Sequence, residues 1–363
     1  MSAAPRTLHG SRVSLAHGSG GKAMKDLIDD VFVRAFGAPD NAPLEDQARL
    51  DIAALAAQGD RIAFTTDSYV VDPLIFPGGD IGTLAVYGTV NDLAVGGAVP
   101  RYLSCAVIIE EGIEIDLLRR IAGSMATAAR RAGVEIVTGD TKVVPRNACD
   151  QLFVTTTGIG AIRRGRDLGV TRARPGDVVV VNGWLGDHGA AILGARGDLR
   201  LDSPIESDCA PLHELIEVLL AAAPGTRCLR DATRGGVATV VNEIAAASGV
   251  AIELDEERTP VRPEVRGFCE ILGLDPLYLA NEGKLVAIVP AAEAVAAVAA
   301  MAAHPLGTHT VALGVVMDPW DPRDPRDPRD PRRGRAGRVT MKTRLGGHRL
   351  VDMLVGEQMP RIC

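Results

Sequence analysis

The stretch RIAFTTDSYVVDPLIFPGGDIGTLAVYGTVNDLAVGGA, residues 61–98, decides the fold class. Within it, Ile62 to Thr66 predicts a strand, and Asp80 is placed to cap a helix that runs to Leu93. A strand followed by a helix is the first unit of an alternating arrangement.

The alternation continues on both sides of a polar boundary rich in Gly and Arg at residues 163–176. Before this boundary, residues 134–137 and 152–159 predict strands, and residues 116–132 predict a helix with one apolar stripe. After it, the continuous apolar run 177–181 is typical of a strand that is covered on both faces. We therefore expect an α+β fold, of layered α/β type, in two lobes.

We expect four parts: a glycine-rich arm (residues 1–45), an N-terminal domain (46–165), a C-terminal domain (170–350) and a mobile tail (351–363). Residues 318–333 repeat Asp-Pro-Arg, and proline at every third position excludes helix and sheet ladders there. This segment is predicted to be an extended loop insertion. An electrostatic docking strip is the alternative, and we assign the segment no function.

Composition narrows the class of protein. Lys and Arg number 39 against 46 Asp and Glu, so the net charge is −7 and nucleic acid is not an expected partner. The sequence contains no run of about 20 strongly apolar residues, so we expect no membrane-spanning helix. The first 22 residues lack the apolar core of a secretion signal, so we expect a cytoplasmic protein. None of the six cysteines forms a C-x-x-C pair, which argues against a zinc ribbon or redox dithiol.

Carboxylates beside small or turn-forming residues recur at Asp67, Asp92, Asp140 and Asp231. Asp67 and Asp140 follow predicted strands and are expected near one crevice beyond the strand ends. A helix cap or a turn is the alternative for each Asp taken alone. Several hard oxygen ligands together suit Mg²⁺, which keeps water and substrate phosphates in its shell. A magnesium-bound nucleotide is the natural ligand.

Basic residues in matching positions support a triphosphate ligand. Lys142 follows one of the Asp turns, and Lys22 ends the segment His-Gly-Ser-Gly-Gly-Lys. This segment is not a Walker P-loop, because Ala16 and Ala23 replace the required glycine and hydroxyl residue. Two interpretations of this segment remain: a glycine-rich arm that folds over phosphates, or a flexible terminus.

Two further residues are candidates for chemistry. Glu282 in Asn-Glu-Gly-Lys is a candidate general base whose pKa burial would raise, and a surface ion pair with Lys284 is the alternative. Cys363 is the last residue, so a buried structural role is hard to arrange for it.

Five segments carry a resemblance that covers nearly the whole chain: residues 67–98, 133–144, 229–245, 274–284 and the ending GGHRLVDMLVGEQMPRIC. They closely resemble the HypE family of hydrogenase maturation factors, the carbamoyl dehydratases. The Asp motifs are shared across the aminoimidazole ribonucleotide synthetase (PurM)-like superfamily, whereas the P-R-I-C ending is the discriminating feature. The Asp-Pro-Arg insertion and Cys149 depart from the family pattern, and neither touches a motif residue.

The resemblance implies that ATP drives dehydration of a carbamoyl group carried on Cys363, which turns a thiocarboxamide into a thiocyanate. The product supplies cyanide for the iron of [NiFe]-hydrogenase. In this scheme Glu282 accepts the proton, Lys142 lies near the transferred phosphoryl group, and Mg²⁺ binds Asp67, Asp92 and Asp140.

The resemblance also places Asp231 and Asn242 near the nucleotide, and we assign Asn91 and Lys22 to the same nucleotide site. A HypF-type carbamoyltransferase would load the tail, and a HypC and HypD complex would accept the cyanide. The family fold further implies a homodimer that forms through the N-terminal sheets.

Two rival functions keep part of this scheme. One is an ATP-dependent kinase or synthetase of the same superfamily that acts on a small molecule. The other is a nucleotide-switched protein that delivers metal with its terminal thiol, although no second soft ligand is visible near Cys363.

Overall fold

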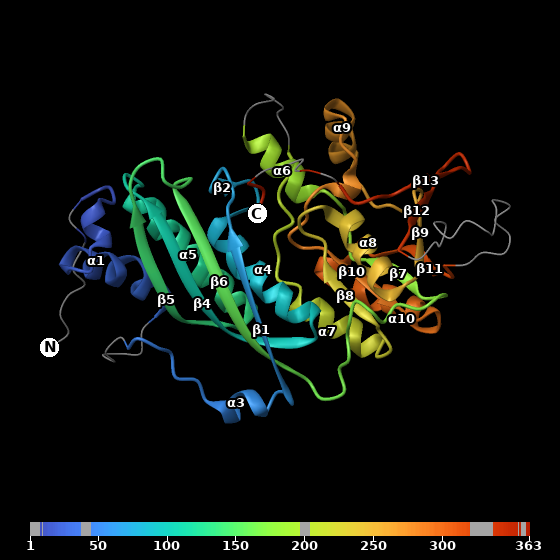
Figure 1. Cartoon of the computed structure of the whole chain (residues 1–363), viewed down its shortest axis with the longest axis horizontal. Coiled ribbons are helices and arrows are strands. Elements are labelled where there is room, and N and C mark those ends of the chain that lie inside the picture. The colour runs from blue at the N-terminus through green and yellow to red at the C-terminus, as the bar shows by residue number, and fades with distance from the viewer. Residues whose placement is uncertain are drawn as a thin grey trace. The chain divides into compact units, whose positions relative to one another are not determined.

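The computed structural model describes residues 8, 10–37, 45–196, 204–319, 337–354, 356 and 361–363. They fall into two compact units (Figure 1). The N-terminal unit takes in the described residues of Met1–Leu93, Ala98–Arg164 and Cys363, and the C-terminal unit those of Ala94–Gly97 and Gly165–Ile362.

A four-stranded sheet with the order β1-β6-β4-β5 forms the centre of the N-terminal unit. Its strands are β1 (Arg61–Tyr69), β6 (Leu152–Ile162), β4 (Ala98–Glu110) and β5 (Glu135–Val144). Strand β6 is antiparallel to β1 and β4, whereas β4 and β5 are parallel. Strands β1, β4 and β5 therefore run in the same direction.

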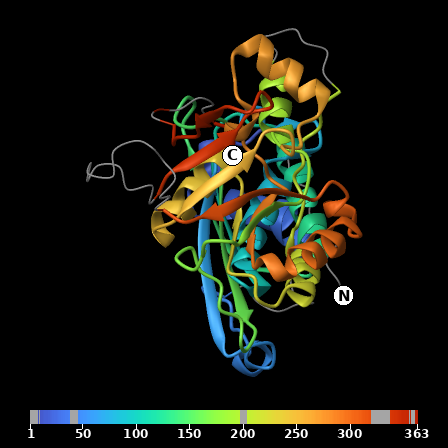
Figure 2. The ribbon, with the colours of Figure 1, turned by 90° about the vertical axis from the view of Figure 1, so that its right-hand side faces the viewer.

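Helices α4 (Ile81–Val95) and α5 (Ile115–Ala132) cover one face of this sheet (Figures 1 and 2). The predicted cap of α4 is confirmed, because Asp80 Oδ1 accepts a hydrogen bond from Thr83 N at 2.8 Å. The opposite face carries apolar side chains: Phe64 is 70% exposed and Ile62 is 62% exposed.

The N-terminal arm is docked on the same unit. Its helical part consists of α1 (Lys22–Leu27), the π-helix η2 (Ile28–Val33) and α2 (Arg34–Phe36). Asp30 of η2 is buried and accepts two hydrogen bonds from Arg119 of α5, at 2.6 and 2.8 Å. The 3-10 helix η1 (Leu15–Gly18) packs on β5, where a Cβ added to Gly18 would lie 2.8 Å from Val143 Cβ. Helix α3 (Ile52–Ala56) and the short strands β2 (Ile75–Phe76) and β3 (Gly79–Asp80) complete the unit.

The C-terminal unit is built on a seven-stranded sheet with the order β13-β12-β9-β11-β7-β10-β8. The strands are β7 (Val178–Val181), β8 (Cys228–Asp231), β9 (Ala251–Asp255), β10 (Leu285–Val289), β11 (Val311–Met317), β12 (Val339–Lys342) and β13 (His348–Leu350). As predicted, β7 is a covered strand: it pairs with both β10 and β11, and Val179, Val180 and Val181 are 0% exposed.

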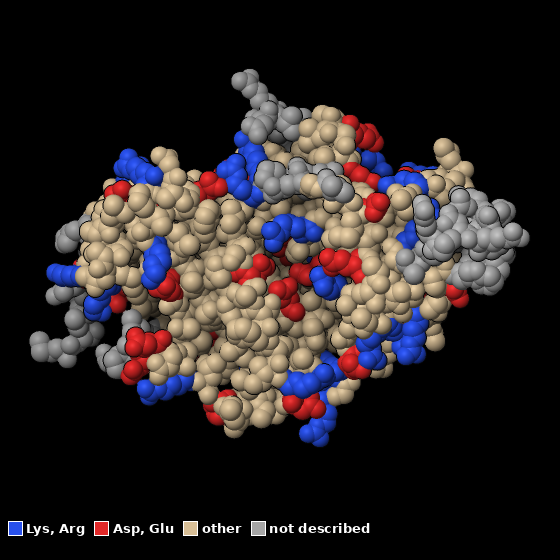
Figure 3. All heavy atoms as spheres, in the orientation of Figure 1, with Lys and Arg blue, Asp and Glu red and all other residues tan. Residues whose placement is uncertain are grey.

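Helices and short turns surround this sheet: α6 (Asp187–Ala195), α7 (His213–Ala222), α8 (Gly236–Ser248), α9 (Pro263–Leu272), α10 (Ala291–Ala302), η3 (Pro276–Tyr278) and η4 (Pro305–Gly307). The expected α+β fold is confirmed. Among the helices that the structure describes, none combines the length and apolar character needed to cross a membrane. On the face drawn in Figure 3, basic and acidic side chains are interspersed over the coloured residues.

Strands β1 and β5 are longer than the sequence pattern predicted. The sequence pattern placed their ends at Thr66 and Val137, whereas β1 continues to Tyr69 and β5 to Val144. Asp67 and Asp140 therefore lie inside strands rather than in turns after them. Both strands are the outer ones of their sheet, where one flank is open to solvent and polar side chains are tolerated. The Asp-Pro-Arg repeat lies almost entirely outside the described residues.

Candidate functional site

Asp67 of β1 faces the side of the sheet that is covered by α4, the helix that carries Asp92. Side chains alternate along a strand, so Asp67 faces the same way as Thr65. Thr65 Oγ1 donates a hydrogen bond to Asp92 Oδ2 at 2.9 Å. The neighbouring Asn91 is buried in α4, with 2% of its surface exposed. Two of the predicted carboxylates therefore lie on the helix-covered face of the sheet.

Asp140 does not join them within one chain. It lies on β5, and β6 and β4 separate that strand from β1. Three strand spacings of about 4.8 Å place Asp140 on the order of 14 Å from Asp67, whereas Mg²⁺ binds its ligands at about 2.1 Å. The described part of the chain contains no group of three or more His, Cys, Asp or Glu side chains that can hold a metal ion. The expected convergence of Asp67, Asp92 and Asp140 does not occur within a single chain.

Asp140 instead pairs with Lys142, whose Nζ lies 3.0 Å from Asp140 Oδ2. Both side chains are more than half exposed, so solvent screens this pair and a phosphate group can compete for the ammonium. Lys22 begins α1 directly after the glycine arm, and the arm packs on β5 at Gly18. The structure therefore places the glycine arm against the strand that carries Lys142.

Asp231 and Glu282 come together in the C-terminal unit. Asp231 ends β8 and pairs with Leu285, the first residue of β10, while Glu282 lies in the turn just before that strand. Glu282 is only 3% exposed. Lys284 Nζ lies 2.8 Å from Asp208 Oδ2, so the lysine is committed to a buried partner rather than to a surface pair with Glu282.

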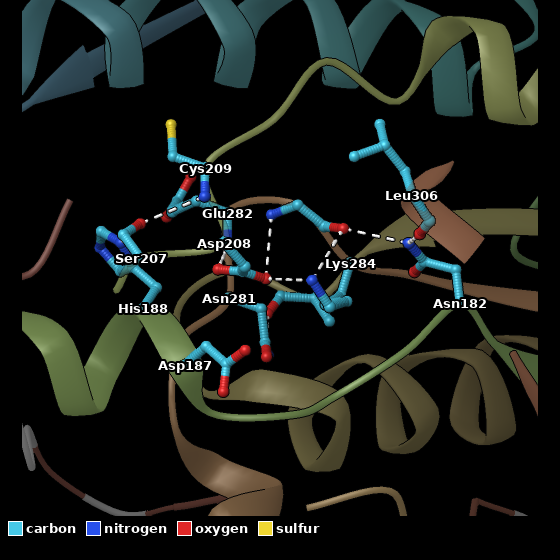
Figure 4. A network of polar contacts seen from close by, with 12 residues as sticks. Asn182, Asp187, His188, Ser207, Asp208, Cys209, Asn281, Glu282, Lys284 and Leu306 are labelled. Atoms are coloured by element: carbon cyan, nitrogen blue, oxygen red, sulfur yellow. Dashed lines mark hydrogen bonds and ion pairs between the residues drawn. The ribbon is translucent and has the colours of Figure 1, made fainter. Parts of the chain in front are cut away.

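Asp208 holds the turn that carries Glu282 (Figure 4). Its carboxylate accepts hydrogen bonds from Glu282 N at 2.9 Å, Gly283 N at 3.2 Å and Lys284 Nζ at 2.8 Å. Burial opposes ionisation of Asp208, but the nearby Lys284 ammonium outweighs it and holds the pKa below its usual range. An ionised carboxylate with three donors therefore fixes the position of the Glu282 backbone.

His188, in the first turn of α6, is a functional candidate that was not predicted from the sequence. His188 is 0% exposed, its Nδ1 lies 2.8 Å from Ser207 Oγ, and its Nε2 lies 2.8 Å from the carbonyl oxygen of Ile362. The C-terminal end of the chain is therefore bound by a side chain that is 174 residues away in sequence. The signal in the sequence was the motif Gly186-Asp187-His188-Gly189, in which two chemically active residues stand between glycines a few residues after the buried strand β7.

Asp187, the first residue of α6, is a second buried group without a sequence-based assignment. Its Oδ2 accepts a hydrogen bond from Arg262 Nε at 3.0 Å, and no partner within hydrogen-bond distance reaches its buried Oδ1 among the described residues. Burial raises the pKa of Asp187, although Arg262 opposes this shift. The start of α6 thus adds a carboxyl group and an imidazole to the surroundings of Glu282 (Figure 4).

The described parts of the tail are held at both ends. At the far end Ile362 is 3% exposed, and Arg196 Nη2 donates a hydrogen bond to the carbonyl oxygen of Arg361 at 2.7 Å. At the root, Asn242 Nδ2 donates to the Val351 carbonyl oxygen at 3.1 Å and to a carbonyl of its own helix at 2.8 Å. Asn242, which the resemblance placed near the nucleotide, therefore anchors the tail.

Burial suppresses the reactivity of several other thiols. It raises the pKa of Cys105 to about 12 and the pKa values of Cys228 and Cys269 to about 11. Because the thiolate is the reactive form of cysteine, these three thiols are poor nucleophiles near neutral pH. Burial, followed by the charges of Glu110 and Asp150, also raises the pKa of Cys149 to about 11. Cys363 is neither fully buried nor fully exposed.

Comparisons with known proteins agree with this arrangement. The pattern of the AIR synthase related protein N-terminal domain matches residues 45–162, and that of the C-terminal domain matches residues 174–323. A Rhodobacter capsulatus protein, "Carbamoyl dehydratase HypE", is 59% identical over 98% of this chain and 99% of its own length.

Two solved structures are also similar. A hydrogenase maturation protein HypE in complex with ATP is 50% identical, covers 96% of this chain and 99% of its own, and has a TM-score of 0.87. A HypE–HypF complex contains a chain that is 42% identical, with a TM-score of 0.75 over 92% of this chain and 100% of that one. From these matches and the P-R-I-C ending, the chain belongs to the HypE carbamoyl dehydratase family, within the AIR synthase related proteins.

Proposed function

We propose that this protein dehydrates a carbamoyl group carried on its own Cys363, at the expense of ATP, and so supplies cyanide during [NiFe]-hydrogenase maturation. One observation carries the proposal beyond the family assignment. Ser207, through His188, holds the carbonyl of Ile362, and the next residue, Asp208, holds the backbone of Glu282. The residue bonded to Cys363 and the candidate base thus belong to one network.

The proposed chemistry proceeds in two steps. The amide oxygen of the S-carbamoyl group attacks the γ-phosphorus of ATP, ADP leaves, and one N–H proton is lost, which gives an S-bound imidate phosphate. A base then takes the second N–H proton while the C–O bond breaks, so that phosphate departs and a C≡N bond forms. The net reaction removes one molecule of water from the carbamoyl group, and that oxygen leaves in phosphate.

Glu282 is the proposed base for the second step. A carboxylate taken out of water is a stronger base than one in solution, because burial disfavours its charged form. Asp208 holds the peptide N–H groups of Glu282 and Gly283, so the turn is fixed before the reaction begins. General bases of this kind contribute about 10²- to 10⁴-fold to a reaction rate.

The residues of the N-terminal unit fit a magnesium-bound triphosphate. Asp67 and Asp92 offer hard oxygen ligands on one face, Lys142 offers an exposed ammonium group, and the glycine arm packs closely on β5 at Gly18. Asp67 and Asp92 would hold Mg²⁺, and Asp140 would join them only from a second copy of the chain. Bound Mg²⁺ would neutralise developing phosphate charge.

Asn91, Asp231 and Lys22 remain our proposed nucleotide contacts. Lys142 is the proposed partner of the transferred phosphoryl group, since phosphoryl transfer depends mainly on positioning and charge neutralisation. The solved complex of a HypE with ATP supports the nucleotide assignment.

The proposed partners follow the same chemistry. A solved HypE–HypF complex supports a HypF-type carbamoyltransferase as the protein that loads Cys363. We further propose that a HypC and HypD complex accepts the cyanide group. A homodimer would cover the exposed face of the N-terminal sheet, where Ile62, Phe64 and Ile108 are 62%, 70% and 40% exposed.

Mass analysis of the C-terminal peptide tests the proposal. The full chain is mixed with the carbamoyltransferase, its carbamoyl donor and ATP, and the C-terminal peptide is weighed at intervals. We expect a carbamoyl adduct on Cys363 that loses one water only when hydrolysable ATP is present, and no adduct in Cys363→Ser. A peptide that is never modified, while ATP is still consumed with a small molecule, would favour the kinase or synthetase alternative.

A further inference from the structure

The hydrogen bonds around His188 determine which of its ring nitrogens carries the proton. The Ile362 carbonyl oxygen can only accept, so His188 Nε2 is the donor in their 2.8 Å contact. Ser207 Oγ accepts from Cys209 N at 3.2 Å, which leaves its own O–H free to donate to His188 Nδ1 at 2.8 Å. Burial lowers the pKa of His188, in agreement with a neutral ring. His188 Nε2 therefore binds the tail, while Nδ1 is held by Ser207.

Two sets of hydrogen bonds connect the neighbours of Ser207 and His188 to the turn that carries the candidate base, Glu282. Asp208, which follows Ser207, accepts hydrogen bonds from the turn that carries Glu282. At the start of α6, Gly186 N donates to Asn281 Oδ1 at 2.8 Å, one residue before Glu282. A displacement of His188 would therefore disturb both its contact with Ile362 and the turn that carries Glu282.

We propose that His188, oriented by Ser207, is a positioning residue that docks the C-terminal tail through the Ile362 carbonyl and so delivers Cys363 to the reaction. The inference rests on the proposed function in taking Cys363 as the carrier. His188, held by Ser207, binds the main-chain carbonyl of Ile362 rather than the thiol of Cys363. This contact therefore does not depend on which group the sulfur carries. The free, carbamoylated and cyanated tails can dock in the same way, with Ile362 as the buried anchor.

Trimming by carboxypeptidase Y measures the docking directly in the full-length protein. The enzyme removes Cys363 and Ile362 only from an undocked tail, and the intact mass reports the loss over time. When opening is fast relative to cleavage, the trimming rate follows the undocked population. We expect His188→Ala to be trimmed about fivefold faster than the wild type, because a hydrogen bond to a buried partner is lost.

Conservative variants separate docking from folding. His188→Gln keeps an N–H donor near the position of Nε2, so its trimming rate should return to within about twofold of wild type. Ser207→Ala should lie between the alanine and glutamine variants at His188. His213→Gln changes a half-buried histidine at the start of α7 in the same unit and should leave trimming unchanged. Equal trimming in His188→Ala and wild type would overturn the proposal.

A second readout links docking to the reaction. With a carbamoylated tail and saturating ATP, His188→Ala should dehydrate the tail several-fold more slowly, and His188→Gln should restore the rate. Slow dehydration that glutamine does not rescue, with normal trimming, would contradict a positioning role. The trimming experiment needs neither ATP nor a carbamoyl donor. If trimming responds as expected but the wild-type tail is never dehydrated, the proposed function fails while the docking site stands.

Discussion

At the scale of single residues, burial separates groups that look alike in the sequence. Asp140 and Lys142 form an exposed pair that solvent screens, whereas Asp208 and Lys284 are 4% and 12% exposed at the side chain. The sequence indicated Glu282 as a candidate base from a short polar motif. The motif around His188 marks it as chemically interesting, but the roles of Asp208 and His188 could not be predicted. These roles depend on contacts with Glu282 and Ile362, which lie far away in the chain.

Replacing the base tests its role. Glu282→Gln keeps the size of the side chain and removes its basicity. We expect it to bind ATP normally, to accumulate the carbamoylated tail and to dehydrate that tail about 10²- to 10⁴-fold more slowly. Single-turnover mass analysis measures the rate, and Glu264→Gln on α9 is the matched control. Dehydration at the wild-type rate would remove Glu282 from the mechanism.

Breaking the buried ion pair between Asp208 and Lys284 should lower the stability of the protein. Asp208→Asn leaves the buried ammonium of Lys284 without its charged partner, so we expect the free energy of unfolding to fall by about 3–5 kcal/mol. Urea denaturation measures the loss. Adding Lys284→Met to Asp208→Asn should recover part of it, because the unpaired charge is then gone. A double variant that is less stable than Asp208→Asn alone would contradict this account.

At the scale of elements, the sequence was a good guide where one segment carries its own signal. The run Val178–Val181 predicted a covered strand, and Asp80 predicted the start of α4. The ends of β1 and β5 were placed too early, because pairing with β6 and β4 extends both strands past their polar residues. The docking of the arm on β5 could not be predicted, because it depends on close packing between Gly18 and Val143.

The cap of α4 provides a test at this scale. Asp80 is 6% exposed, and its Oδ1 accepts from Thr83 N at 2.8 Å and from Ser124 Oγ at 2.7 Å. We expect Asp80→Ala to lower the free energy of unfolding by about 1–2 kcal/mol, the usual range for a lost N-cap. Asp116→Ala, an exposed acidic residue in the first turn of α5, should change it by less than about 1 kcal/mol. Equal losses in the two variants, measured in urea, would refute the assignment.

At the scale of the whole molecule, the two-lobed α+β architecture could be predicted from the alternation of strands and helices. The single chain does not gather Asp67, Asp92 and Asp140 around one ion, a result that sequence spacing could not anticipate. One face of the N-terminal sheet leaves large apolar side chains exposed to solvent, which is typical of a protein–protein interface. We propose a second copy of the chain in that position.

Sedimentation velocity tests the dimer. Phe64→Glu places a charge at an apolar position whose side chain is 70% exposed. We expect the wild type to sediment as a dimer and Phe64→Glu as a monomer with an unchanged circular dichroism spectrum. Val295→Glu, at a residue that is 83% exposed on α10, should remain dimeric. A Phe64→Glu variant that sediments as a dimer would show that the interface lies elsewhere.

The fate of the carbamoyl oxygen tests the central claim most directly. The tail is loaded with a carbamoyl group whose carbonyl oxygen is ¹⁸O, and a single turnover with ATP is analysed by mass spectrometry. If ATP phosphorylates this oxygen on Cys363, the label appears in the released phosphate as the thiocyanate forms. Thiocyanate formed with unlabelled phosphate, or label released into water, would contradict the mechanism.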